Sequence, residues 1–152
     1  MSDRTRARGI GRARQVAGGI GNDRLISSGN SKDLLVGGSG TDLLDAGAAE
    51  DVLVAGRTSY DAGSYDDVRA LTAILNEWSR ASSYATSIAH ITGTLSGGLN
   101  GSSVFRTSGP SATVFDDADI DTLVGGTGRD WLLAGAIDQK PDLAGTEVVT
   151  GL

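Results

Sequence analysis

Cysteine is absent from this chain of 152 residues, and histidine occurs once, as His90. The lack of cysteine excludes a disulfide framework and thiolate metal sites, although it leaves the redox compartment open. A single histidine excludes the H-E-x-x-H zinc motif, and any serine-based triad would have to use His90. We therefore predict that the chain is not an enzyme and that His90 is a helix surface or packing residue.

Long apolar runs are also missing. No stretch reaches the roughly eighteen consecutive apolar residues of a membrane span, and the N-terminal segment has no apolar run typical of a secretory signal. Aromatic residues make up 5% of the chain, whereas glycine occurs 23 times. Because such a backbone loses more entropy on folding than an average one, something other than apolar burial is expected to stabilise it.

The charge is divided unevenly along the chain. Aspartate supplies 16 of the 19 acidic residues, and the formal net charge is −6. Five arginines and only Asp3 occur in the first sixteen residues, so this segment carries +4 and the remainder −10. We expect cations as partners of the main body and no nucleic-acid role for it. Residues 1–17 are predicted to form a disordered basic arm, with contact to an anionic surface as the alternative.

A nine-residue repeat runs through the acidic part of the chain. The units are 18–26 (GGIGNDRLI), 28–36 (SGNSKDLLV), 37–45 (GGSGTDLLD), 46–54 (AGAAEDVLV), 116–124 (DDADIDTLV) and 125–133 (GGTGRDWLL). Their aspartates are Asp23, Asp33, Asp42, Asp51, Asp121 and Asp130. The extra residue Ser27 makes the first step ten residues rather than nine. This periodicity is typical of a repeat architecture.

The units resemble the G-G-x-G-x-D-x-U-x nonapeptide of the RTX, or hemolysin-type calcium-binding repeat, family. Units 18–26, 37–45 and 125–133 match at every defined position, and the other three are degenerate. The resemblance covers 18–54 and 116–133. The layout is also similar to the C-terminal region of large bacterial surface or secreted proteins, which implies an extracellular or cell-surface location.

The residue types fit calcium, which binds carboxylate and main-chain carbonyl oxygens. Glycines allow positive φ and leave room for carbonyls to approach an ion, while aspartate adds negative charge. The expected metal ligands and turn residues are Gly18, Gly19, Gly21, Asp23, Asp33, Gly37, Gly38, Gly40, Asp42, Asp51, Asp121, Gly125, Gly126, Gly128 and Asp130. Gly-Asp pairs also form ordinary turns, which is the alternative for any single unit. Six stacked aspartates without an ion, however, would repel one another.

The family resemblance implies a mainly β fold, a parallel β-roll in which two units make one coil and calcium lies between turns on the same side. Asp23 would then share an ion with the carbonyls around Gly37, Gly38 and Gly40, and Asp42 with the turn near Ala55 and Gly56. Asp33 would use the turn before Asp51. We expect weaker sites where Lys32 and Ala49 break the motif. The interior should be lined by Leu25, Leu35, Leu44, Leu53, Leu123 and Leu132, one from each extended segment.

Residues 18–152 are predicted to form one domain, with repeats at 18–59 and 116–136, an insertion at 60–115 and a C-terminal tail at 137–152. Within the insertion, Ser64 and Asp67 form a capping-box pattern before an apolar stripe, which predicts a helix over 65–79. A second helix is expected over 83–91, followed by a loop. The apolar stripe should cover an exposed end or face of the roll.

Two functions remain open from the sequence. The first is a structural module that folds on binding calcium, at the end of an exported protein. The alternative is an adhesion or interaction module that calcium stiffens, whose insertion contacts a protein or cell-surface partner.

Overall fold

The computed structural model describes residues 12–152, which form ten strands and two helices. Most strands belong to two parallel sheets. Sheet A contains, in spatial order, β1 (Gln15–Ile20), β3 (Leu34–Ser39), β5 (Val52–Val54), β9 (Trp131–Ala134) and β10 (Val148–Gly151). Sheet B contains β2 (Arg24–Ile26), β4 (Leu43–Asp45) and β8 (Thr122–Val124).

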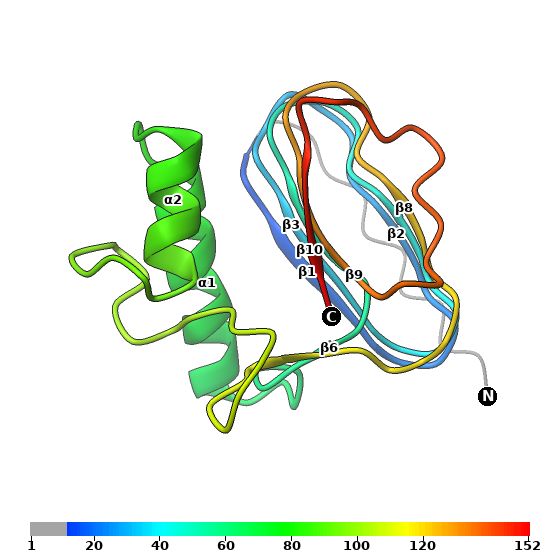
Figure 1. The fold of residues 1–152 in the computed structure, drawn as a ribbon, viewed down its shortest axis with the longest axis horizontal. Coiled ribbons are helices and arrows are strands. Elements are labelled where there is room, and N and C mark those ends of the chain that lie inside the picture. Colours follow the sequence, from blue (N-terminus) through cyan, green and yellow to red (C-terminus); the bar gives the residue numbers. More distant parts are fainter. Residues whose placement is uncertain (1–11) are drawn as a thin grey trace.

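The chain alternates between the two sheets, so each coil contributes one strand to each (Figure 1). Leu34 of β3 pairs with Val52 of β5, eighteen residues later, which equals two nine-residue units. Units 18–26 and 37–45 therefore stack on one another, and so do units 28–36 and 46–54. The predicted parallel arrangement of the strands is confirmed.

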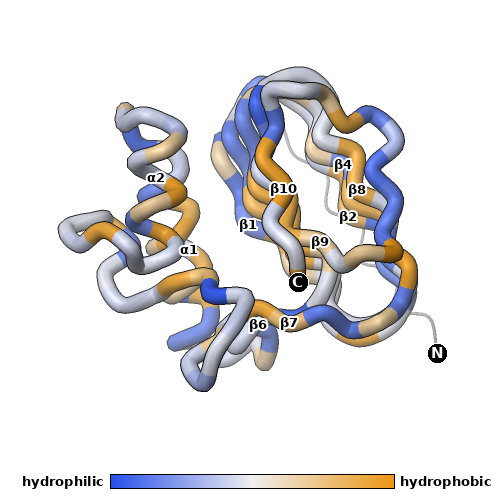
Figure 2. Tube along the Cα trace, viewed as in Figure 1, coloured by the Kyte–Doolittle hydropathy of each residue, from blue (hydrophilic) through white to orange (hydrophobic). Residues whose placement is uncertain are grey.

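The space between the sheets is filled by aliphatic side chains. All six leucines predicted for the interior are at most 1% exposed and belong to one apolar cluster: Leu25, Leu35, Leu44, Leu53, Leu123 and Leu132. Hydrophobic residues follow the stacked strands, while the turns are more hydrophilic (Figure 2). This confirms the predicted interior, which is narrow and contains no aromatic side chain.

The insertion leaves the repeats after β5 and returns through a short antiparallel pair, β6 (Arg57–Thr58) with β7 (Val114–Phe115). It contains α1 (Tyr65–Ser79) and α2 (Tyr84–Ile91), as predicted. Ser64 and Asp67 form the expected capping box, in which each side chain accepts the other residue's main-chain N–H. This pairing satisfies donors that the first helical turn leaves free.

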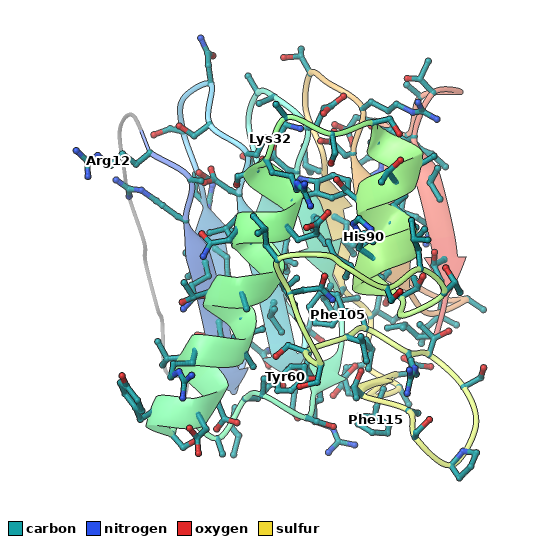
Figure 3. All side chains as sticks on the ribbon, turned by 90° about the vertical axis from the view of Figure 1, so that its left-hand side faces the viewer. Arg12, Lys32, Tyr60, His90, Phe105 and Phe115 are labelled. Atoms are coloured by element: carbon teal, nitrogen blue, oxygen red, sulfur yellow. The ribbon has the colours of Figure 1, made fainter. Side chains whose placement is uncertain are left out.

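The insertion covers the outer face of sheet A rather than an end of the stack (Figure 1). From the insertion's side, α1 and α2 stand in front of the sheet-A strands (Figure 3). Trp78 of α1 lies 6.0 Å from Trp131 of β9 between ring centroids, and its Nε1–H donates to the carbonyl of Glu50. Sheet A is therefore buried on both faces, which explains why its central strands alternate little between apolar and polar residues.

Two predicted boundaries are wrong. The arm was expected to extend to residue 17, but β1 begins at Gln15 and pairs with β3, where Leu34 N–H donates to the carbonyl of Arg14. The segment 137–152 was expected to be a tail, but it contains β10, which pairs with β9. An edge strand needs only a pairing partner, so neither strand requires the glycine motif. The rest of the predicted arm, residues 1–11, lies outside the described residues.

Over residues 12–152, neither helix combines the length and apolar character that crossing a membrane requires.

Candidate metal centre

The repeat aspartates form two columns, one at each side of the stack where the chain passes from sheet to sheet. Column I, in the turns from sheet A to sheet B, consists of Asp23, Asp42, Asp121 and Asp138. Column II, in the turns from sheet B to sheet A, contains Asp33, Asp51 and Asp130. The side chains are at most 7% exposed and point into the protein rather than into solvent.

In the stacked aspartates that follow Asp23 along the chain, one carboxylate oxygen accepts a main-chain N–H from the preceding coil. In column I, Oδ1 of Asp42 accepts the main-chain N–H of Asp23 at 2.7 Å, and Oδ1 of Asp121 accepts that of Asp42 at 2.7 Å. Column II repeats the pattern with Asp33, Asp51 and Asp130. These bonds fix the orientation of the carboxylates, because each Oδ1 is anchored along the stack.

The second carboxylate oxygen of these aspartates, Oδ2, has different surroundings from Oδ1. Oδ2 is buried without a hydrogen-bond partner in four aspartates, Asp42, Asp51, Asp121 and Asp130. A buried polar atom without a partner costs about 1–3 kcal/mol, and more when it is charged. The site therefore presents carboxylate oxygens that need a positive charge.

Burial raises the pKa of these carboxyl groups. The pKa reaches about 6 for Asp42, about 7 for Asp121 and Asp130, and about 8 for Asp51. Desolvation is the main cause, and neighbouring carboxylates raise the values further. Without a cation, these groups favour the neutral form at a pH where an ordinary aspartate is charged.

The glycine that begins each full motif makes room for these oxygens. A Cβ atom on Gly37 would lie 2.6 Å from Asp42 Oδ2 and 2.4 Å from the carbonyl oxygen of Ala55 in the next coil. At Gly18 the corresponding distances are 2.7 Å to Asp23 Oδ2 and 2.4 Å to the carbonyl oxygen of Gly37. A carboxylate and a next-coil carbonyl thus converge on a space that only glycine leaves open, as a calcium ligand set requires.

The remaining predicted glycines shape the turns. Positive φ angles occur at Gly19, Gly21, Gly38, Gly40, Gly126 and Gly128. No group of three or more His, Cys, Asp or Glu side chains that could bind a metal occurs among residues 12–152. Any calcium ligand set in these turns must therefore include main-chain carbonyls.

Comparison with known families agrees with this geometry. The model of the RTX calcium-binding nonapeptide repeat matches four copies, over residues 27–58 and 115–136. The chain carries RTX repeats. These repeats indicate calcium binding, and they are typical of secreted bacterial proteins. No curated protein and no solved structure matches the chain.

Asp33 departs from Asp42, Asp51, Asp121 and Asp130 because both of its oxygens have donors. Ser27 Oγ donates to Asp33 Oδ2, and Arg14 N–H donates to Asp33 Oδ1 at 2.8 Å. A weaker site is predicted here because of Lys32, which pairs with Glu50 at 2.7 Å. The extra residue Ser27 thus distinguishes this turn, because its hydrogen bond leaves Asp33 with fewer free lone pairs for an ion than Asp51 has.

Asp138 was missed by the sequence analysis because no glycine motif precedes it. Its Oδ1 accepts the main-chain N–H of Asp121 at 3.0 Å, and its Oδ2 accepts that of Gly135 at 2.8 Å. Column I therefore continues past the last matched RTX repeat and ends at a carboxylate whose two oxygens are both bonded.

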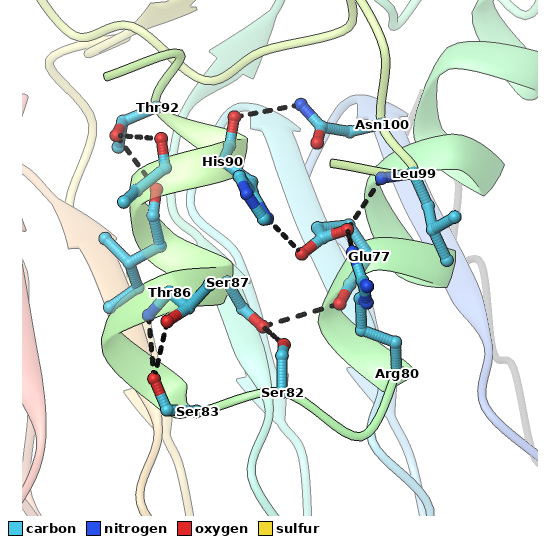
Figure 4. A network of polar contacts seen from close by, with 12 residues as sticks. Glu77, Arg80, Ser82, Ser83, Thr86, Ser87, His90, Thr92, Leu99 and Asn100 are labelled. Atoms are coloured by element: carbon cyan, nitrogen blue, oxygen red, sulfur yellow. Dashed lines mark hydrogen bonds and ion pairs between the residues drawn. The ribbon is translucent and has the colours of Figure 1, made fainter. Parts of the chain in front are cut away.

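A second buried carboxylate lies in the insertion. Glu77 is fully buried and accepts hydrogen bonds from His90 Nδ1 at 2.6 Å, Leu99 N–H at 2.7 Å and Arg80 Nη1 at 3.1 Å (Figure 4). Burial acts to raise the pKa of Glu77, but these hydrogen bonds together outweigh it and lower the pKa. His90 is 8% exposed, so the structure places it in the interior, as a packing residue.

Proposed function

We propose that this chain is a non-catalytic structural module that folds on binding calcium and belongs to an exported or surface protein. The observation that carries the proposal is the set of four buried aspartates, Asp42, Asp51, Asp121 and Asp130, whose Oδ2 atoms have no hydrogen-bond partner. A divalent cation would balance the negative charge of these oxygens. It would also lower the carboxyl pKa values that burial raises.

The proposed architecture is a closed parallel β-roll with calcium between successive turns. Its support is the alternation of the chain between two parallel sheets and the convergence of Asp42 Oδ2 with the carbonyl of Ala55 at Gly37. Bound calcium supplies two positive charges and accepts oxygen ligands from both coils. The aspartates provide charge, the carbonyls complete the ligand set, and the glycines keep the space open.

Linkage explains how calcium would control folding. A ligand that binds only the folded chain stabilises it by about 2.7 kcal/mol per independent site at a hundred times its dissociation constant. The interior between the sheets is thin, consisting of aliphatic side chains alone. Several ions would therefore outweigh the cost of ordering the glycine-rich turns, and the module would fold where calcium is abundant, as it is outside the cell.

The alternative, an insertion that contacts a partner, has less support. The apolar side chains of α1 and α2, including Leu71, Ile74 and Trp78, are already packed against sheet A. A helix that uses its apolar stripe within its own fold has less apolar surface to offer a partner. The insertion is better explained as a cover for the outer face of sheet A.

Isothermal titration calorimetry of the chelator-treated full chain tests calcium binding directly. We expect more than one calcium ion per chain, since the open oxygens are distributed over both columns. Absence of calcium binding at millimolar concentration would refute the proposed function.

A further inference from the structure

The segment after the last matched repeat continues column II with a glutamate. Val148 of β10 pairs with Trp131 of β9, so Glu147 lies in register with Asp130. Val148 N–H donates to the carbonyl of Asp130 at 3.1 Å, just as Trp131 N–H donates to the carbonyl of Asp51 at 2.8 Å. Glu147 therefore occupies the position that an aspartate holds in the preceding coils.

The Glu147 carboxylate is held in a defined orientation. Its Oε2 accepts the main-chain N–H of Ala144 at 2.6 Å. Its Oε1 lies 3.1 Å from the point where a Cβ atom on Gly125 would be, and Asp130 Oδ2 lies 2.4 Å from the same point. Asp130 is fully buried, and its Oδ2 has no hydrogen-bond partner. The two carboxyl groups thus lie close enough for a side-chain hydrogen bond while Asp130 holds a proton, and this bond is lost when both groups are ionised.

The space at Gly125 resembles the space at Gly37 with one exchange. At Gly37 the space is bordered by Asp42 Oδ2 and by the carbonyl oxygen of Ala55 in the next coil. At Gly125 the oxygen from the next coil is the Glu147 carboxylate instead of a carbonyl. We propose that Glu147 is a calcium ligand that closes column II, binding an ion together with Asp130 at the end of the stack.

Because a carboxylate replaces a carbonyl, the site at Gly125 carries more negative charge than the site at Gly37. Two carboxylates border it, and Asp142 lies close by with its Oδ2 bonded to Gly126 N–H at 2.7 Å. Calcium affinity rises with the number of charged ligands, so this site should bind more tightly than a site with one carboxylate. Because Glu147 directly precedes β10, the ion would also fasten the last strand to the repeats.

The inference rests on the proposed calcium binding and is tested by Glu147→Gln, which removes the charge and keeps the shape. In calorimetry of the full chain with calcium alone, we expect one site to disappear or its dissociation constant to rise at least about tenfold. The charge-matched control is Asp66→Asn, on the exposed start of α1, which should bind like the unaltered chain. An isotherm for Glu147→Gln identical to that of the unaltered chain would overturn the inference.

Hydrogen exchange of the unaltered chain gives a readout that does not depend on a variant folding. Calcium should slow the exchange of the β10 amides, Val148–Gly151, relative to the chelated chain, and unchanged exchange there would also overturn the inference. Different results would refute the proposed function and the proposed role of Glu147. If the unaltered chain binds no calcium, the proposed function is wrong. If it binds calcium and Glu147→Gln binds equally well, only the role of Glu147 is wrong.

Discussion

Asp51 donates its main-chain N–H to the Oδ1 atom of Asp130, 79 residues later in the chain, at 2.8 Å. The whole insertion lies between these two residues, yet the bond has the same form as that between Asp33 and Asp51 within one repeat block. The repeats before and after the insertion therefore form one continuous stack. The insertion is an enlarged turn between β5 and β8, and it leaves both columns uninterrupted.

The two aspartates of column II that precede the insertion should respond differently to the same substitution. Asp51→Asn is expected to remove one calcium site, because Asp51 has an open Oδ2 atom. Without calcium the same change should stabilise the fold by about 1–3 kcal/mol, since it replaces a buried, uncompensated carboxylate by a neutral group. Calorimetry gives the number of ions, and the midpoint of an osmolyte-induced folding transition in chelator gives the change in stability.

Asp33→Asn is the matched control for that prediction. Its oxygens already accept hydrogen bonds from Ser27 and Arg14, so the change should leave the number of bound ions the same. Equal loss of calcium in both variants would show that the open oxygen does not decide where calcium binds.

The stability of the metal-free chain should fall as pH rises from about 5 to about 8. Aspartate is ionised in the unfolded chain above its ordinary value of 3.8, whereas the folded chain keeps protons on Asp51 until about 8 and on Asp121 and Asp130 until about 7. The folded state therefore binds more protons in this window and loses stability as they become scarce. Far-UV circular dichroism in chelator, with a stabilising osmolyte at constant concentration, measures the folded fraction across the window; a folded fraction that rises with pH would contradict the burial of these groups.

The backbones of two neighbouring coils approach each other closely at Gly126, which leaves no room for a side chain. This residue has a φ of +85°, and a Cβ atom on it would lie 1.9 Å from the carbonyl oxygen of Gly47. Gly126→Ala should destabilise the calcium-bound fold by about 2 kcal/mol or more. Gly145→Ala is the control, because nothing lies within 4 Å of its Cβ position. Chemical denaturation should separate the two variants, and similar midpoints would argue against this contact.

The stability of the insertion should depend on the buried carboxylate of Glu77. Glu77→Ala leaves His90 and the Leu99 N–H without their acceptor in a buried site, which should cost about 3 kcal/mol. The exposed carboxylate of Asp66 provides the comparison, since Asp66→Ala removes a charge at the surface of the same helix. Differential scanning calorimetry measures both. An unfolding temperature for Glu77→Ala equal to that of Asp66→Ala would mean that the network does not stabilise the insertion.

The sequence predicted the repeated core of the fold because its signals are local and periodic. The spacing from Asp33 to Asp42 to Asp51 placed the strands, the leucine that follows each aspartate marked the interior, and Ser64 marked the start of α1. The strands at the two ends of the stack, β1 and β10, were missed because they lack this local, periodic signal. Arg14 and Glu147 stand where an aspartate is expected, and β10 follows β9 at seventeen residues instead of eighteen.

The candidate site was predicted less completely than the core. Motif matching identified Asp33 as a ligand because it occupies the right position, but whether its oxygens are open depends on Ser27, which bonds to it only in the folded chain. The carboxylates of Asp138 and Glu147 likewise join the columns through strand pairing rather than through a motif. Tertiary contacts of this kind leave no periodic signal in the sequence.

Far-UV circular dichroism during a calcium titration of the chelated full chain tests the central claim most directly, since calcium is proposed to join carboxylates and carbonyls of neighbouring coils. We expect a largely disordered spectrum in chelator that becomes a folded spectrum as calcium is added. Identical spectra with chelator and with saturating calcium would contradict it.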